Sequence, residues 1–92
     1  MKVRVEFFAD MRNHLGTARE VIEFHGENMI DLIDFLNEKY GLRFKEMILE
    51  GEGQKENVKI LVNGMDIRGL QGLSTSIKEG DNVSFFPPIA GG

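Results

Sequence analysis

The sequence contains no cysteine and only two prolines among its 92 residues. The absence of cysteine excludes disulfide bonds, thiolate catalysis, iron–sulfur clusters and cysteine-ligated zinc. A domain of this size buries only about 60–65% of the surface that its unfolded chain exposes, so without disulfides it depends on one modest core. These features favour a protein of the cytoplasm, where thiols stay reduced and disulfides are rare.

Long apolar runs and clusters of one charge are also missing. Charged residues interrupt the opening MKVRVEFFAD, so we expect neither a signal peptide nor a membrane span. Lys and Arg are scattered and the net charge is −4, which argues against a nucleic-acid partner. No G-x-x-x-x-G-K-[ST] pattern is present, so the chain is expected to have no ATP site of its own. His14 and His25 lack partners at metal spacing, and we expect no metal site and no bound cofactor.

Short periodic segments follow one another along the chain. Lys2 to Phe8 alternates apolar and charged residues, which predicts a half-buried strand. Asn28 is a good N-cap, and apolar residues at helical spacing predict a helix over Met29–Tyr40. The other predicted elements are a short helical turn at Ala9–Leu15 and strands at Ala18–Phe24, Val58–Val62, Met65–Ile67 and Asn82–Phe86. The segment 42–49 is ambiguous, and the Gly-rich segment 51–57 is predicted to be a mobile loop.

This order of elements predicts an α+β fold in which one main helix packs across a mixed sheet. The first and last strands would lie side by side at the sheet centre, as in the β-grasp, or ubiquitin-like, fold. We expect a single domain over residues 1–88, followed by a flexible C-terminal tail at 89–92.

The tail ends in Gly91-Gly92, and this is where the sequence places chemistry. Without Cβ atoms, two terminal glycines can thread a narrow channel in a partner and leave the terminal carbonyl carbon open to attack. The α-carboxylate of Gly92 is ionised at neutral pH and could attack the α-phosphate of ATP. A sulfide donor could then displace AMP from the resulting acyl-adenylate and leave a thiocarboxylate.

The residues before the tail suit a docking role. Pro87-Pro88 ends the last strand and stiffens the base of the tail, so fewer conformations are lost on binding. By alternation, one of Phe85 and Phe86 faces the core and the other lies on the surface near Ile89, as part of a partner patch. Lys59, Arg68 and Lys78 could meet acidic residues of an activating enzyme or be ordinary surface charge.

Two stretches of the chain resemble the small subunit of molybdopterin synthase (MoaD-like), within the MoaD/ThiS ubiquitin-like sulfur-carrier family. The opening VRVEFFADMRNHLG is similar to the F-A-x-x-R-x-x-x-G start of that family, and the FFPPIAGG ending is the specific part of the resemblance. Between them, VNG and a degenerate L-x-x-GD-x-V motif also match.

The resemblance implies a carrier that has no active site of its own. An E1-like enzyme would use ATP to adenylate Gly92, sulfur would be loaded there as a thiocarboxylate, and the large subunit of molybdopterin synthase would take up the tail. Sulfur would then pass to a pyranopterin precursor in molybdenum or tungsten cofactor biosynthesis. Gly91 and Gly92 carry over as the reactive end. The residues that carry over as the partner-binding lead-in are Phe86, Pro87, Pro88, Ile89 and Ala90.

Three alternatives remain open at the level of the sequence. The same activated end could be joined to lysines, as in a ubiquitin-like protein modifier, or could supply sulfur for the thiazole of thiamine. The third alternative is a plain interaction module with no tail chemistry, which would tolerate an extra residue after Gly92. A β-grasp ferredoxin is excluded because there is no cysteine to bind a cluster.

Overall fold

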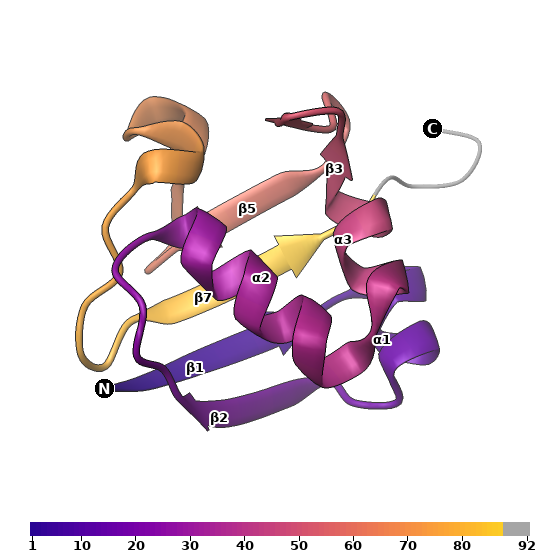
Figure 1. Cartoon of the computed structure of the whole chain (residues 1–92), viewed down its shortest axis with the longest axis horizontal. Helices are drawn as coiled ribbons and strands as arrows, with labels where there is room; N and C mark the ends of the chain where they lie inside the picture. The colour runs from indigo at the N-terminus through magenta and orange to yellow at the C-terminus, as the bar shows by residue number, and fades with distance from the viewer. Residues whose placement is uncertain (88–92) are drawn as a thin grey trace.

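A computed structural model describes residues 1–87, apart from the side chains of His14 and Leu42. Within this range five strands form one mixed sheet in the order β2-β1-β7-β5-β6 (Figure 1). The strands are β1 (Lys2–Phe7), β2 (Arg19–Glu23), β5 (Lys59–Val62), β6 (Met65–Asp66) and β7 (Asn82–Phe86). β1 and β7 pair in parallel and the other pairs are antiparallel. The first strand therefore lies beside the last strand at the sheet centre, and the predicted β-grasp fold is confirmed.

The helices lie on one face of this sheet, where α2 (Met29–Tyr40) crosses the strands (Figure 1). Asn28 and Asp31 form a reciprocal capping box, in which each side chain accepts a hydrogen bond from the other residue's backbone N–H. Two shorter helices are α1 (Ala9–Leu15) and α3 (Leu42–Ile48). Gly41 separates α2 from α3 with a φ of 98°, a conformation that favours glycine.

One hydrophobic core fills the space between helices and sheet. The strands contribute alternate residues and α2 contributes its apolar stripe, and all of them are buried: Val3, Val5, Phe7, Ile22, Met29, Leu32, Ile33, Leu36, Ile60, Val62, Val83 and Phe85. Ile77 is buried too, as expected for a residue that fills the core between two irregular segments. The apolar residues of the alternating strands and of the amphipathic helix are therefore buried in one common core.

Two segments differ from the sequence prediction. Most of the ambiguous segment 42–49 forms α3, because Phe44 and Ile48, four residues apart on one helix face, are both fully buried. The segment 51–57, predicted as a mobile loop, contains β4 (Gly53–Gln54), which forms a hairpin with β3 (Leu49–Glu50) just before it. The returning strand is also shorter than predicted, since Ile67 begins the 3₁₀ turn η1 (Ile67–Gly69), and a second turn, η2, spans Gly72–Ser74.

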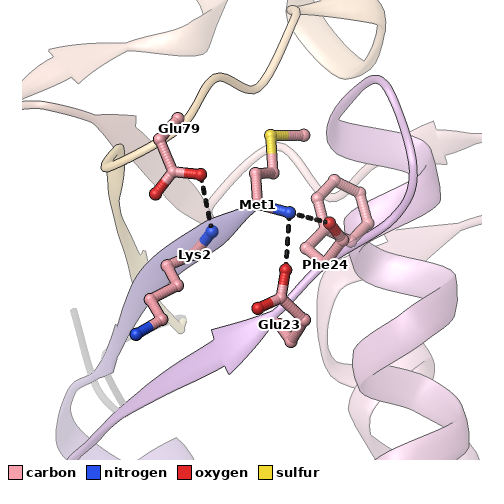
Figure 2. Close-up of polar contacts among 5 residues, drawn as sticks. All are labelled: Met1, Lys2, Glu23, Phe24 and Glu79. Carbon is pink, nitrogen blue, oxygen red and sulfur yellow. Dashed lines mark hydrogen bonds and ion pairs between the residues drawn. The ribbon is translucent and has the colours of Figure 1, made fainter.

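Polar contacts tie the start of β1 to its surroundings (Figure 2). The Met1 amino group donates to the Glu23 carboxylate at 2.6 Å and to the Phe24 carbonyl at 2.9 Å. The Lys2 backbone N–H donates to Glu79 at 3.1 Å. The positive Met1 amino group holds the pKa of the Glu23 carboxyl below its usual value, because the ion pair favours the charged form.

Candidate functional site at the base of the C-terminal tail

The structure describes only part of the site that the sequence predicts. Phe86 and Pro87 are described, whereas Pro88, Ile89, Ala90, Gly91 and Gly92 lie outside the described residues. The predicted boundary between domain and tail, at residues 88 and 89, lies outside them as well. The described part of the site is therefore the surface around Phe86 and Pro87, where the described chain ends.

This surface begins with the split between two adjacent phenylalanines of β7. Phe85 is fully buried and packs against Phe7 and Phe44, with ring centroids 5.8 Å and 5.3 Å apart. Phe86 points to the opposite side of the sheet, as alternation requires, and is only partly buried. The prediction that one of the two faces the core and the other the surface is confirmed. Pro87, which follows them, is buried.

A second aromatic ring completes the surface at this point. Phe8 stacks on Phe86 with ring centroids 4.3 Å apart and an interplanar angle of only 7°. The Phe8 backbone N–H donates to the Phe85 carbonyl at 3.2 Å, which holds the two chain segments together where β1 ends. The next residue, Ala9, has a φ of 53°, so the chain turns sharply away from the sheet into α1. The two stacked rings together form an apolar platform.

The register of the sheet shows what surrounds the platform. Lys59 lies opposite Phe86, and Leu61 lies opposite Ser84 on the same face. Leu61 is partly buried, Ser84 is buried and Lys59 is exposed. The base of the tail therefore has an apolar centre of Phe8, Phe86 and Leu61, with the cation Lys59 on the β5 side and the anion Glu6, opposite Ser84, on the β1 side. Such a composition is typical of a docking surface for a protein.

The largest pKa shift among the described residues is that of Tyr40, which lies away from this surface. Burial and the adjacent Glu20 carboxylate, which accepts a hydrogen bond from the Tyr40 hydroxyl, raise the pKa of Tyr40. Lys39 also pairs with Glu20, at 3.3 Å. These contacts fasten the end of α2 to β2, so their role is to position elements. Among residues 1–87, no group of three or more histidine, aspartate and glutamate side chains is placed to hold a metal ion.

Sequence reasoning missed Phe8, and it did not foresee the contacts of Arg68, which it left open as either a partner contact or ordinary surface charge. The Arg68 guanidinium donates to three backbone carbonyls, of Val58 at 2.9 Å, Lys55 at 2.7 Å and Glu56 at 3.0 Å. Its donors are therefore directed to its own chain, and it fastens η1 to the segment before β5. Phe8 could have been found from the sequence, because two Phe-Phe pairs, 7–8 and 85–86, end the two strands that the fold places side by side.

None of the helices within residues 1–87 has the length and apolar character needed to cross a membrane.

Comparison with known proteins places this chain in a family. The model of the ThiS family matches residues 5–92. Small archaeal modifier protein 3 of Haloferax volcanii is 32% identical over 93 residues, which cover all of both chains. The sulfur carrier protein CysO of Mycobacterium tuberculosis is 33% identical over 94 residues, again over the full length of both chains.

A solved structure agrees with this placement. A Pyrococcus furiosus protein, described provisionally as molybdopterin converting factor subunit 1, is 36% identical, with a TM-score of 0.76 over 97% of this chain and 99% of that one. The family match and both curated relatives extend to the glycine-terminated end of the chain. The chain therefore belongs to the ThiS family of ubiquitin-like sulfur carriers.

Proposed function

We propose that this protein carries sulfur as a thiocarboxylate on Gly92 and donates it to the pyranopterin precursor of molybdopterin, as the small subunit of molybdopterin synthase. Two observations together support the proposal: the family match extends through residue 92, and two stacked aromatic rings lie at the base of the tail. The 36% identity to the Pyrococcus furiosus protein supports the molybdopterin branch.

The chemistry requires two partners. An E1-like enzyme binds ATP and brings its α-phosphate to the Gly92 carboxylate, which attacks it and releases pyrophosphate. A sulfide-level donor then attacks the carbonyl carbon of the acyl-adenylate, AMP leaves with its bonding electrons, and a thiocarboxylate remains. The large subunit of the synthase receives the loaded tail, where the sulfur passes to the precursor.

The platform explains how both partners could recognise the same carrier. Phe86 and Phe8 already stack on each other in the free chain, so a partner that covers them meets an apolar surface that is formed before binding. Five residues follow Pro87, and a fully extended chain of that length spans at most about 17 Å. A partner that docks on the platform must therefore place its reactive site within that distance of Pro87. Pro87 and the lead-in from Pro88 to Ala90 set the direction of the tail in this proposal.

The test is the intact mass of the protein after incubation with an E1-like enzyme, ATP and sulfide. We expect a gain equal to one sulfur replacing one oxygen, localised to Gly92 by fragmentation. The matched control has one alanine appended after Gly92, which moves the carboxylate away from the site and abolishes the gain without changing thermal unfolding. Sulfur loading of the extended variant would contradict the assignment of Gly92.

A second assay assigns the acceptor. The loaded carrier, mixed with the synthase large subunit and the pyranopterin precursor, should return to its carboxylate form as the dithiolene forms. Loading without any transfer to the precursor would contradict the molybdopterin assignment and leave the sulfur-carrier assignment standing.

A ubiquitin-like protein modifier is the second candidate, and the 32% identity to small archaeal modifier protein 3 favours it. The same acyl-adenylate would then be attacked by a lysine amine, which forms an isopeptide bond and releases AMP. Tryptic digestion of cellular proteins would in that case yield lysines that carry residues 79–92, because Lys78 is the last trypsin site before Gly92. A tagged strain without such remnants would argue against this candidate.

A further inference from the structure

The outer edge of β2 has a backbone whose hydrogen-bonding groups the sheet does not use. Among residues 1–87, β2 pairs with β1 alone and is the border strand of the sheet (Figure 1). The Phe7 N–H donates to the Ala18 carbonyl, and the Phe24 N–H donates to the Met1 carbonyl. In an antiparallel pair the bonded positions alternate, so even-numbered residues of β2 bond to β1. Odd-numbered residues therefore direct their N–H and C=O groups outward.

Those residues are Arg19, Val21 and Glu23. The Arg19 carbonyl accepts a hydrogen bond from the Thr17 hydroxyl at 3.1 Å, which leaves its second lone pair available. Five residues long and free of proline, β2 is a much longer edge than the opposite border strand β6, which has two residues. Edges of this kind pair readily with another strand unless something prevents it.

The side chains on this edge are also arranged symmetrically. Val21 is 59% exposed, the most exposed of the large apolar side chains in the described part of the chain. A cation, Arg19, lies two residues before Val21 and an anion, Glu23, lies two residues after it. All three project from the same face of the sheet, because side chains alternate along a strand. The Glu23 side chain remains 56% exposed beside Met1.

We propose that β2 pairs antiparallel with β2 of a second copy of this chain, about a two-fold axis that passes between the two Val21 residues. In this register Val21 lies opposite Val21, and Arg19 lies opposite Glu23 of the partner on both sides of the axis. Each of the three positions presents its outward N–H and C=O to the opposing strand, so the backbone bonds and the charges match in the same register. The two sheets join into one continuous sheet.

Charge explains why the occupant is a second copy. An edge with charges of one sign would repel its own copy, which is how many proteins protect a free edge. Here charges of opposite sign lie at equal distances from a central apolar residue, and a two-fold axis turns that arrangement into two attractive pairs. The platform consists of Phe8, which follows β1, and Phe86, which ends β7. Neither residue belongs to the border strand β2, so the dimer leaves the base of each tail free.

The interface is small, so the dimer is expected to be weak. Sedimentation equilibrium from about 10 µM to about 1 mM should show a monomer–dimer equilibrium, in the range expected for an interface of a few side chains. The backbone amide NMR signals of Arg19, Val21 and Glu23 should shift with concentration. A chain that stays monomeric over this range would overturn the proposal.

A charge exchange tests the register itself. Arg19→Glu and Glu23→Arg each convert both attractive pairs into repulsive ones, so each variant alone should dimerise more weakly by about tenfold or more. An equimolar mixture of the two variants should recover dimerisation, because every pair in the mixed dimer is again attractive.

The matched controls are Lys55→Glu and Glu52→Arg. They make the same changes in net charge in the segment before β5, a strand three places from β2 in the sheet order. Neither control, alone or mixed, should change dimerisation. Dimerisation that persists in both edge variants, or a mixture that stays monomeric, would rule out this pairing. Thermal unfolding of each variant shows whether it is folded.

Discussion

Phe85 and Phe86 are neighbours in the sequence with different physical environments. The ring of Phe85 lies among core aromatics with no exposed surface, whereas the ring of Phe86 is partly exposed and covered on one side by Phe8. A single step along a strand reverses the face of the sheet, and this reversal separates a residue that stabilises the fold from one that is available to a partner.

Alanine at each position should separate the two roles. Phe85→Ala removes a fully buried ring and should lower the free energy of unfolding by about 3–5 kcal/mol, measured by urea titration. Phe86→Ala removes a partly exposed ring and its stacking on Phe8, and should cost about 1–2 kcal/mol. The Phe86 variant should nevertheless lower kcat/KM for adenylation by the activating enzyme. Equal losses of stability at both positions would show that Phe86 belongs to the core.

Among the elements, α2 has the best-defined boundaries. Its first turn is satisfied by the capping box of Asn28 and Asp31, and the Asp31 carboxylate also accepts from the Glu27 N–H at 2.9 Å. Its last turn is fastened to β2 through Tyr40 and Glu20. Because both ends are anchored, the apolar face between them stays over the centre of the sheet.

Asn28→Ala should therefore destabilise the protein. The substitution leaves the Asp31 N–H without its acceptor at the N-terminus of α2, and we expect a loss of about 1 kcal/mol in the free energy of unfolding. Glu38→Ala is the control, at an exposed position of the same helix, and should change stability by less than about 0.5 kcal/mol. If both variants unfold at the same urea concentration, the capping box contributes nothing measurable.

At the scale of the molecule, the first and last strands of the described chain lie side by side. β1 and β7 pair through Arg4–Asn82, Val5–Val83, Glu6–Ser84 and Phe7–Phe85, so the sheet closes only when the last strand is in place. Pairings between strands so far apart in sequence carry a high entropic cost of loop closure, which is repaid when the core assembles. The strand that precedes the tail is thus also the strand that completes the fold.

Two truncations follow from this arrangement. Removing residues 89–92 should leave thermal unfolding nearly unchanged, because the proposed domain ends at residue 88. Removing 82–92 takes away Val83 and Phe85 from the core and the partner of both β1 and β5, and should abolish cooperative unfolding measured by circular dichroism. A large loss of stability in the short truncation would show that the last four residues belong to the folded body.

The sequence by itself determined the class of fold and the position of most elements. Alternation in 2–8 and the capped apolar stripe of 29–40 each specify their structure locally, because side-chain period and capping act over a few residues. The FFPPIAGG ending resembled the family for the same reason, since a short sequence motif is a local feature.

Tertiary structure decided the rest. Helix formation at 42–48 depends on burial of Phe44 and Ile48 against distant strands, and the three acceptors of Arg68 come from a segment ten or more residues away. The Phe8–Phe86 platform exists only because parallel pairing brings residue 8 beside residue 86. Likewise, the cation and the anion on either side of Val21 indicate a pairing edge only once β2 is known to be the border strand. Local patterns carry no information on which distant residues meet, because that is set by the packing of the whole core.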